Sequence, residues 1–210
     1  GLTFANGLRT LLRQDPNIIM VGEIRDNETA QLAVNAALTG HLVLSTLHTN
    51  SAAGALPRLI DMEVEPFLIA STVNAILAQR LVRTLGPEKE KYKLTADEIK
   101  SLGEEVPLEK IVRLLRDKKI IKGAETMQDV SFYKAKPSKE SPDGYKGRVG
   151  IHEVMEITST IKELIIKKAS HAEIAAQAEK EGMITMLEDG FLKAAQGITS
   201  IEEVLRVTSE

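Results

Sequence analysis

An acidic side chain at the end of an apolar run is the first feature of the sequence that suggests chemistry. Residues 18–21 are all apolar, three of these four are β-branched, and Gly22 and Glu23 follow. Such a run predicts a strand that is buried on both faces of a parallel sheet. Glu23 would then lie just beyond the carboxyl end of that strand, where open α/β sheets bind ligands. A carboxylate there can orient water for attack on a phosphate group, although many strands end in an acid without such chemistry.

A histidine follows the next predicted strand. Asn27 is predicted to cap a helix that ends before Gly40, and residues 42–47 form a strand that leads into His48. A strand, helix and strand in this order cross over with a right-handed connection and bring both strand ends to one edge. We therefore expect Glu23 and His48 to be neighbours, with His48 either an ordinary polar residue or a hydrogen-bond partner of a γ-phosphate oxygen.

Several segments, in order along the chain, resemble the ATPases of type II secretion and type IV pilus assembly. The matching segments are residues 1–5, 11–16, 20–26, 38–50, 78–83, 144–153 and 182–208. The occurrence of all these segments in the family's order is specific for the family, whereas no single segment is specific by itself. The resemblance implies an α/β fold that contains part of a RecA-like P-loop core with a mostly parallel sheet, then a charged helical insertion and a C-terminal helical subdomain. These three parts would occupy residues 1–85, 86–144 and 145–210.

The resemblance also assigns the candidate site residues. Gly22 and Glu23 match the acidic Walker B box, with Gly22 in place of the usual aspartate, and His41 and His48 match a histidine box. Glu23 would polarise the attacking water, and His48 would contact the γ-phosphate. His41 stands at the entrance to a strand, where a structural role is equally consistent with the sequence. Arg25 is counted with the nucleotide-binding residues.

Other charged residues have structural explanations as well. Arg25 and Asp26 are adjacent, so they can pair with each other or with a neighbouring subunit, and an exposed pair contributes little to stability. Residues 66–85 are predicted to form one long helix with an apolar stripe. Arg80 and Arg83 would then lie near its C-terminal end, where they complement the helix dipole or contact another subunit.

The loop that would hold the phosphates is not found in the sequence. No G-x-x-x-x-G-K-[ST] motif is present, and in the family this loop lies upstream of the segment that Gly1 begins. We therefore expect a piece of a longer ATPase that uses Mg-ATP, with magnesium near Glu23 and the phosphate loop supplied from upstream. The chain by itself is expected to bind ATP poorly and to hydrolyse none.

The family commonly carries a four-cysteine zinc site in the insertion, but this chain has no cysteine. The positions that match the four ligands are Gly86, Lys89, Pro137 and Glu140. None can supply a thiolate, so no structural zinc is expected. The insertion is instead expected to consist of helices held only by packing, with a capping box at Thr95 and a mobile loop over residues 134–143.

The sequence is predicted to be helical from Gly150 to its end. The predicted N-caps are Thr158, Ser170 and Ser200, the last two with capping-box spacing. His152 and His171 have no partner at metal-ligand spacing, so both are interpreted as structural residues.

Composition limits the partners. A net charge of −3 argues against direct nucleic-acid binding, and no apolar run approaches 18 residues, so no membrane span is predicted. By resemblance, the protein would be a cytoplasmic hexamer, peripheral to the inner membrane, that acts on an inner-membrane platform protein. The insertion favours the assembly or secretion type over the retraction type. A catalytically silent ring scaffold and a DNA-uptake or conjugation ATPase remain as alternatives.

Overall fold

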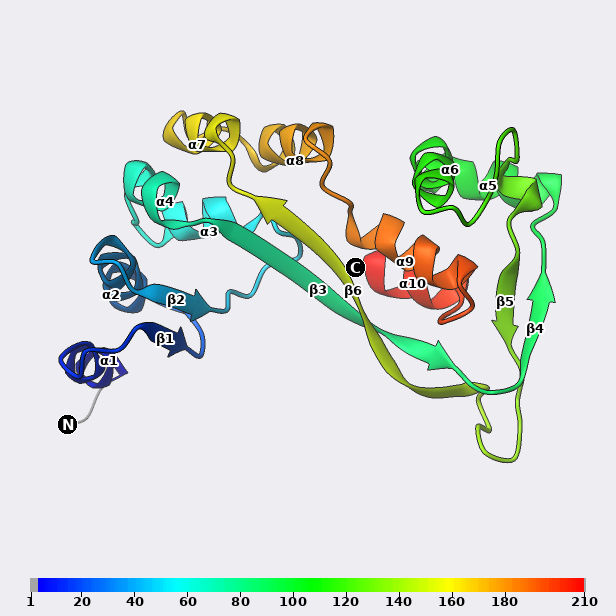
Figure 1. Ribbon diagram of the computed structural model, residues 1–210, viewed down its shortest axis with the longest axis horizontal. Helices are drawn as coiled ribbons and strands as arrows, with labels where there is room; N and C mark the ends of the chain where they lie inside the picture. The colour runs from blue at the N-terminus through cyan, green and yellow to red at the C-terminus, as the bar shows by residue number, and fades with distance from the viewer. Residues whose placement is uncertain (1–3, 210) are drawn as a thin grey trace. The chain divides into compact units, whose positions relative to one another are not determined.

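The computed structural model describes residues 4–209 and consists of two compact units, each built from two stretches of chain (Figure 1). The first unit comprises Gly1–Ala78 and Val154–Met183, and the second comprises Gln79–Glu153 and Ile184–Glu210. Both units contain helices and strands, which confirms the mixed α/β class. The predicted division of the chain into three parts, with boundaries at residues 85 and 144, was based on family segments and not on compactness, and it stays a prediction.

The first unit contains the predicted strand, helix and strand. Strand β1 (Ile18–Val21) pairs in parallel with β2 (Leu42–Ser45), and α2 (Asn27–Leu38) connects them. The other helices of this unit are α1 (Phe4–Leu12), α3 (Ala55–Asp61), α4 (Pro66–Thr72), α7 (Ser159–Ile166) and α8 (His171–Lys180). One apolar core, which includes Ile19, Leu56, Ile69 and Ile161, joins the sheet to α2, α3, α4, α7 and α8.

The prediction that β1 is buried on both faces is wrong within the described part of the chain. Ile19 and Val21 are buried, whereas Ile18 and Met20 are 59% and 79% exposed. Their cross-strand partners on β2, Leu42 and Leu44, are exposed as well. One face of the sheet packs into the core, and no described element covers the other, so the alternating burial follows the period of the strand.

The N-cap of α2 is Asp26 and not Asn27 as predicted. Asp26 has an extended backbone, and its carboxylate accepts a hydrogen bond from the backbone N–H of Thr29 at 2.8 Å. Asn27 is already helical, and its side chain donates to Glu63 at 2.9 Å. The predicted end of the helix is confirmed, because Gly40 follows the C-cap with φ +95°, which favours glycine.

Residues 66–85 do not form one helix. Helix α4 ends at Thr72, and the chain continues as the long strand β3 (Ala75–Leu85), which pairs with β6 (Tyr145–Glu156). The prediction of helix from Gly150 onward is therefore also wrong up to Glu156. In β3 exposure alternates along Ala75–Leu81 with the two-residue period of a strand.

The second unit is built around a strand pair that the sequence did not predict. Strand β4 (Lys89–Tyr92) runs antiparallel to β5 (Phe132–Ala135). The helices are α5 (Ala96–Glu105), α6 (Leu108–Asp117), the short 3₁₀ helix η1 (Met127–Asp129), α9 (Met186–Ala195) and α10 (Ile201–Thr208). Phe132 and Phe191 are fully buried and meet edge to face at 6.3 Å between ring centroids.

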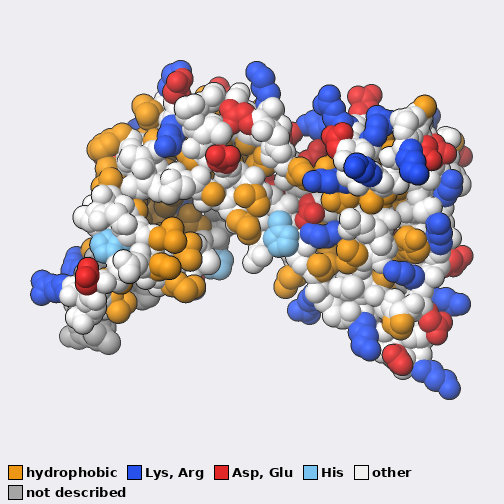
Figure 2. Space-filling view, in the orientation of Figure 1, with side chains coloured by type: hydrophobic (Ala, Val, Ile, Leu, Met, Phe, Trp, Pro, Cys, Tyr) orange, Lys and Arg blue, Asp and Glu red, His pale blue; other side chains and the backbone are white. Residues whose placement is uncertain are grey.

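The insertion is thus held by a strand ladder as well as by packing, which corrects the prediction of packing alone. The helical part of that prediction is confirmed, since Thr95 forms a capping box at the start of α5. Lysine, arginine and acidic side chains are mixed over the surface of this unit (Figure 2). This is the pattern of a solvated surface.

The positions that match the zinc ligands make other contacts. The N–H of Gly86 donates to the carbonyl of Gly144 at 2.8 Å, and Lys89 Nζ donates to the carbonyl of Gly197 at 2.6 Å. Glu140 pairs with Lys146 at 3.6 Å. Within residues 4–209, no group of three or more histidines and acids could hold a metal ion. The absence of zinc from the protein stays a prediction.

The predicted caps of the later helices are confirmed. Thr158, Ser170 and Ser200 each accept a hydrogen bond from the backbone N–H three residues further on. The capping box predicted at Ser200 is not formed among the described contacts, because the carboxylate of Glu203 binds Arg83 and Arg206 instead of the Ser200 backbone. Arg83 lies in β3, so its predicted place at a helix end is wrong.

Within residues 4–209, no helix is both long and apolar enough to cross a membrane.

Two helical glycines provide a matched test of packing. Gly190 in α9 is buried against Val204 of α10, and a Cβ built there would collide with the Cγ1 atom of Val204. We expect Gly190→Ala to lower the free energy of unfolding by about 1–3 kcal/mol through overpacking. Gly103→Ala in the exposed helix α5 is the control: its Cβ would lie 3.3 Å from Cδ1 of Leu108, the flexible end of a side chain that can shift, and alanine favours helix by about 1 kcal/mol, so the change should cost much less than Gly190→Ala. Urea denaturation measures both, and equal effects would contradict the packing argument.

Candidate active site

The ends of β1 and β2 stay joined beyond the strands themselves. The hydroxyl of Thr46 donates to the carbonyl of Gly22 at 2.6 Å, and the N–H of Ile24 donates to the carbonyl of Thr46 at 2.9 Å. These bonds hold the two outgoing segments together at the carboxyl edge of the parallel pair. Glu23 lies on one segment and His48 lies on the other.

The predicted neighbourhood of Glu23 and His48 is confirmed. The Nε2 atom of His48 lies 3.0 Å from Oε2 of Glu23, and the Nε atom of Arg25 lies 2.7 Å from the same oxygen. The Glu23 side chain is 36% exposed, and those of His48 and Arg25 are 81% and 71% exposed. The carboxylate is therefore held by two donors at an edge that a ligand can reach.

These contacts favour the ionised form of the carboxylate. The hydrogen bond from His48, and then that from Arg25, lower the pKa of Glu23 below its ordinary value. Glu23 is thus ionised near neutral pH and has no proton to donate. An ionised carboxylate suits a group that orients water or binds next to a cation.

The structure does not bring His41 to this edge. His41 immediately precedes β2, at the amino end of the strand, whereas Glu23 and His48 lie at the carboxyl ends. Its Nδ1 atom lies 2.9 Å from the carbonyl of Ala36 and 3.0 Å from the hydroxyl of Thr39. His41 therefore contacts the end of α2, and its role at a nucleotide stays a prediction.

Arg25 and Asp26 do not pair with each other. Arg25 binds Glu23, and the carboxylate of Asp26 caps α2. The hydrogen bond to the backbone of Thr29 lowers the pKa of Asp26. Gly22 is exposed, and a Cβ added there would meet no described atom within 4 Å.

Two contacts near the site were missed by the sequence interpretation. Thr46 joins the strand ends, and the hydroxyl of Ser51 lies 2.8 Å from Nε2 of His171 at the start of α8. The loop that follows His48 is thereby attached to a helix 120 residues further along the chain. The structural role predicted for His171 agrees with this contact, but nothing in the sequence identifies Ser51 as its partner.

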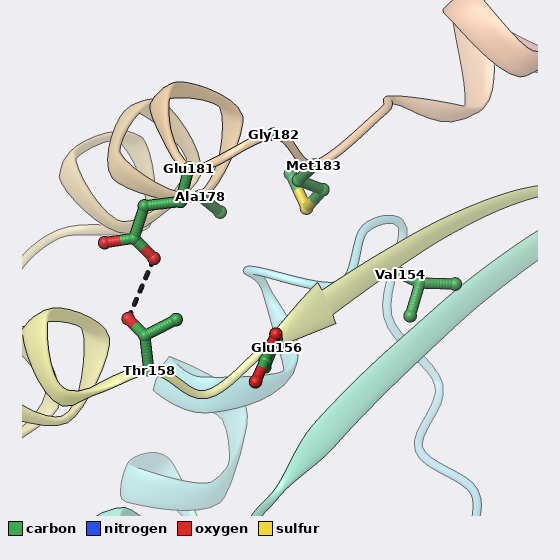
Figure 3. A pocket seen from close by; sticks show the side chains of 7 residues that line it. All are labelled: Val154, Glu156, Thr158, Ala178, Glu181, Gly182 and Met183. Carbon is green, nitrogen blue, oxygen red and sulfur yellow. Dashed lines mark hydrogen bonds between the residues drawn. The ribbon is translucent and has the colours of Figure 1, made fainter.

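A small cavity in the first unit does not belong to this edge. It has a volume of about 160 Å³ and lies between the end of β6 and the end of α8 (Figure 3). Its wall includes Thr158, whose hydroxyl donates to Glu181 at 2.8 Å. None of the predicted site residues lines it, so it gives no support for a nucleotide pocket.

The donor set at Glu23 is compatible with magnesium. Mg²⁺ commonly takes one or two carboxylates together with water and substrate phosphates, so one exposed carboxylate is sufficient. Glu23 would be the protein group next to the ion, and this assignment stays a prediction.

Comparison with known proteins decides the family. The family model described as type II/IV secretion system protein matches residues 1–206. The chain belongs to this family. Type II secretion system ATPase E of Vibrio cholerae is 48% identical over 215 residues, and type II secretion system protein E of Xanthomonas campestris is 46% identical over 211 residues. Type IV pilus assembly ATPase PilB of Pseudomonas aeruginosa is 44% identical over 211 residues.

The chain spans about a third of the length of these curated relatives. All of the chain is matched in each case, but only 38%, 34% and 34% of the Vibrio, Xanthomonas and Pseudomonas proteins respectively. Two solved structures share the fold. The pilus retraction motor PilT with bound ADP has a TM-score of 0.63 at 23% identity, over 99% of this chain and 44% of that protein. The Legionella pneumophila ATPase DotB has a TM-score of 0.60 at 24% identity, over 99% and 42%.

The hydrogen bond between His48 and Glu23 can be tested in the 210-residue chain of this secretion family member. We expect His48→Ala to raise the pKa of Glu23 toward its ordinary value, because the largest stabilisation of the ionised carboxylate is lost. NMR titration of the carboxyl carbon measures this change. His41→Ala is the control and should leave the pKa unchanged, since His41 bonds only to the end of α2 among the described contacts. An unaltered titration in His48→Ala would contradict the assignment.

Proposed function

We propose that this chain is part of an ATP-hydrolysing motor of type II secretion or type IV pilus assembly, in which Glu23 orients the attacking water. The observation that carries the proposal is the Glu23 carboxylate, held between His48 and Arg25 at the carboxyl edge of two parallel strands. A charged acceptor in this position can fix a water molecule for in-line attack on a phosphate.

His48 has a second role in the proposal. Its ring donates to Glu23, and the side chain is 81% exposed. The ring is therefore free to turn from the carboxylate to a γ-phosphate oxygen. Such an exchange would make the hold on Glu23 depend on the presence of the nucleotide. Arg25 would keep Glu23 ionised during the exchange, because it bonds to the same oxygen.

The wider assignments rest on the relatives. Proteins named as type II secretion and type IV pilus assembly ATPases match the whole chain at 44–48% identity, which supports a motor function. We extend this to a RecA-like P-loop core with Mg-ATP as the cofactor. The phosphates of ATP would supply the bond that is broken, and magnesium would neutralise their charge. A hexameric ring on the cytoplasmic face of the inner membrane, acting on a platform protein, completes the proposal.

Glu23→Gln in the complete protein tests the function. Hydrolysis should fall by about 100-fold or more, because the neutral amide cannot hold water as the carboxylate does, while ATP binding should persist. Steady-state phosphate release and nucleotide binding measure the two effects. Glu28→Gln is a matched control in α2, since the Glu28 side chain forms an exposed ion pair with Arg9, and the variant should give normal turnover.

Three outcomes separate this proposal from its alternatives. Full turnover in Glu23→Gln would remove Glu23 from its role. A complete protein without any turnover would support a silent ring scaffold. Turnover that depends on DNA would support a transport ATPase for nucleic acid.

The 210-residue chain should show no Mg-dependent ATP turnover by itself. The sequence has no phosphate-binding loop, so the chain offers Glu23 and His48 without the groups that fix the β- and γ-phosphates. A coupled phosphate-release assay with and without Mg²⁺ measures this, with the complete protein as the positive control. Measurable turnover by the chain, abolished in Glu23→Gln, would contradict the expectation.

A further inference from the structure

The second unit contains a basic hollow that the proposed function does not use. It is open, has a volume of about 540 Å³, and is lined by Leu81, Arg83, Arg148 and Arg206. These four residues belong to β3, β6 and α10, and each of the four lies in the second unit. Three guanidinium groups from three separate elements therefore surround one space.

A buried carboxylate fixes two of these arginines. The Glu203 side chain is only 2% exposed, and its oxygens accept from Arg83 Nη2 at 2.6 Å and from Arg206 Nε and Nη2 at 3.0 and 2.9 Å. The backbone N–H of Arg83 donates to the same carboxylate at 3.0 Å. Burial alone would raise the pKa of Glu203, but the bonds from Arg206 and Arg83 outweigh it and hold the pKa well below its usual range. Glu203 thus stays charged and keeps both arginines in place.

Arg83 is held on a second side by an aromatic ring. Its guanidinium carbon lies 4.1 Å from the centroid of the Tyr145 ring, and Nη1 lies 3.3 Å from Asp143. A cation over a ring face is a favourable arrangement that also restricts rotation. Much of the entropy cost of ordering a long side chain around a ligand has therefore already been met in the folded protein.

The third arginine is free to bind something else. Arg148 is exposed, and no acid among the described residues pairs with it. Three guanidinium groups line the hollow; Glu203 pairs with Arg83 and Arg206, Asp143 pairs with Arg83, and Arg148 adds a positive charge that no described acid offsets. The lining therefore carries excess positive charge.

We propose that this hollow binds a phosphate group. The guanidinium fork matches phosphate oxygens in pairs, and phosphate presents oxygens in three dimensions to arginines that come from different directions. A carboxylate, which is planar, is satisfied by one fork. Leu81 is 56% exposed at the wall and would contact the apolar part of a phosphate-bearing molecule. A free phosphate compound and a lipid headgroup share this chemistry.

Arg148→Gln is the decisive variant. Replacing Arg83 or Arg206 would leave the buried Glu203 short of a partner and could unfold the unit. Arg148 has no ion pair among the described residues, so its replacement removes a ligand contact without exposing a buried charge. Arg113→Gln in α6 is the matched control, because Arg113 is also exposed, lies in the same unit and has no described ion pair.

The first experiment titrates the 210-residue chain with inorganic pyrophosphate and measures binding by calorimetry and amide chemical shifts. We expect binding that weakens as salt is added, and a loss of about tenfold or more in Arg148→Gln. Arg113→Gln should bind as the parent chain does. Thermal unfolding of each variant confirms that the fold is retained.

The second experiment identifies the source of the phosphate. Vesicles of phosphatidylcholine with about 30% phosphatidylglycerol are compared with phosphatidylcholine alone. Binding of pyrophosphate that depends on Arg148 supports a free phosphate ligand. Binding that depends on Arg148 and is seen with the anionic vesicles but not with pyrophosphate supports a lipid headgroup. Binding of neither, or an equal loss in Arg113→Gln, would overturn the proposal. A change of oligomeric state in Arg148→Gln with unchanged phosphate binding would also overturn it and assign the surface to a protein contact.

Discussion

The register of β1 against β2 is the constraint on which the candidate site depends. The strands pair in parallel, and hydrogen bonds from Thr46 to Gly22 and from Ile24 to Thr46 extend the pairing beyond them. A slip of one residue would turn each side chain to the other face of the sheet. It would expose Ile19 and separate Glu23 from His48. The packing of the first unit and the geometry of its candidate site are thus set by the same hydrogen bonds.

Local signals made a large part of this fold predictable. Thr95, Thr158 and Ser170 cap helices because a side-chain oxygen near the first turn satisfies a free N–H, and this needs no distant partner. The neighbourhood of Glu23 and His48 followed from the strand, helix and strand connection, which makes the two strands parallel and brings both carboxyl ends to one edge. Assigning the cap of α2 to Asn27 in place of Asp26 was an error of one residue, since both side chains can cap.

Contacts between distant parts of the sequence were not predictable in this way. The run through β3 has apolar residues at spacings that fit a helix or a strand, and its pairing with β6 decides the outcome. Arg83 and Glu203 are separated by 120 residues, so nothing in the sequence joins them. The same applies to Ser51 and His171. The exposed face of β1 differs from the prediction because no described element covers Ile18 and Met20.

The buried carboxylate of Glu203 also restricts how this protein can change. Removing either arginine leaves the buried Glu203 carboxylate with too few donors, at a cost below the figure of about 3–5 kcal/mol for a fully buried pair, because Arg83 and Arg206 are 41% and 53% exposed. Removing Glu203 leaves two guanidinium groups that repel each other. A variant with none of the three would lose these charges together and could be stable. We therefore expect evolution to replace the three residues together. Because the single-substitution intermediates would fold poorly, such a replacement should be rare.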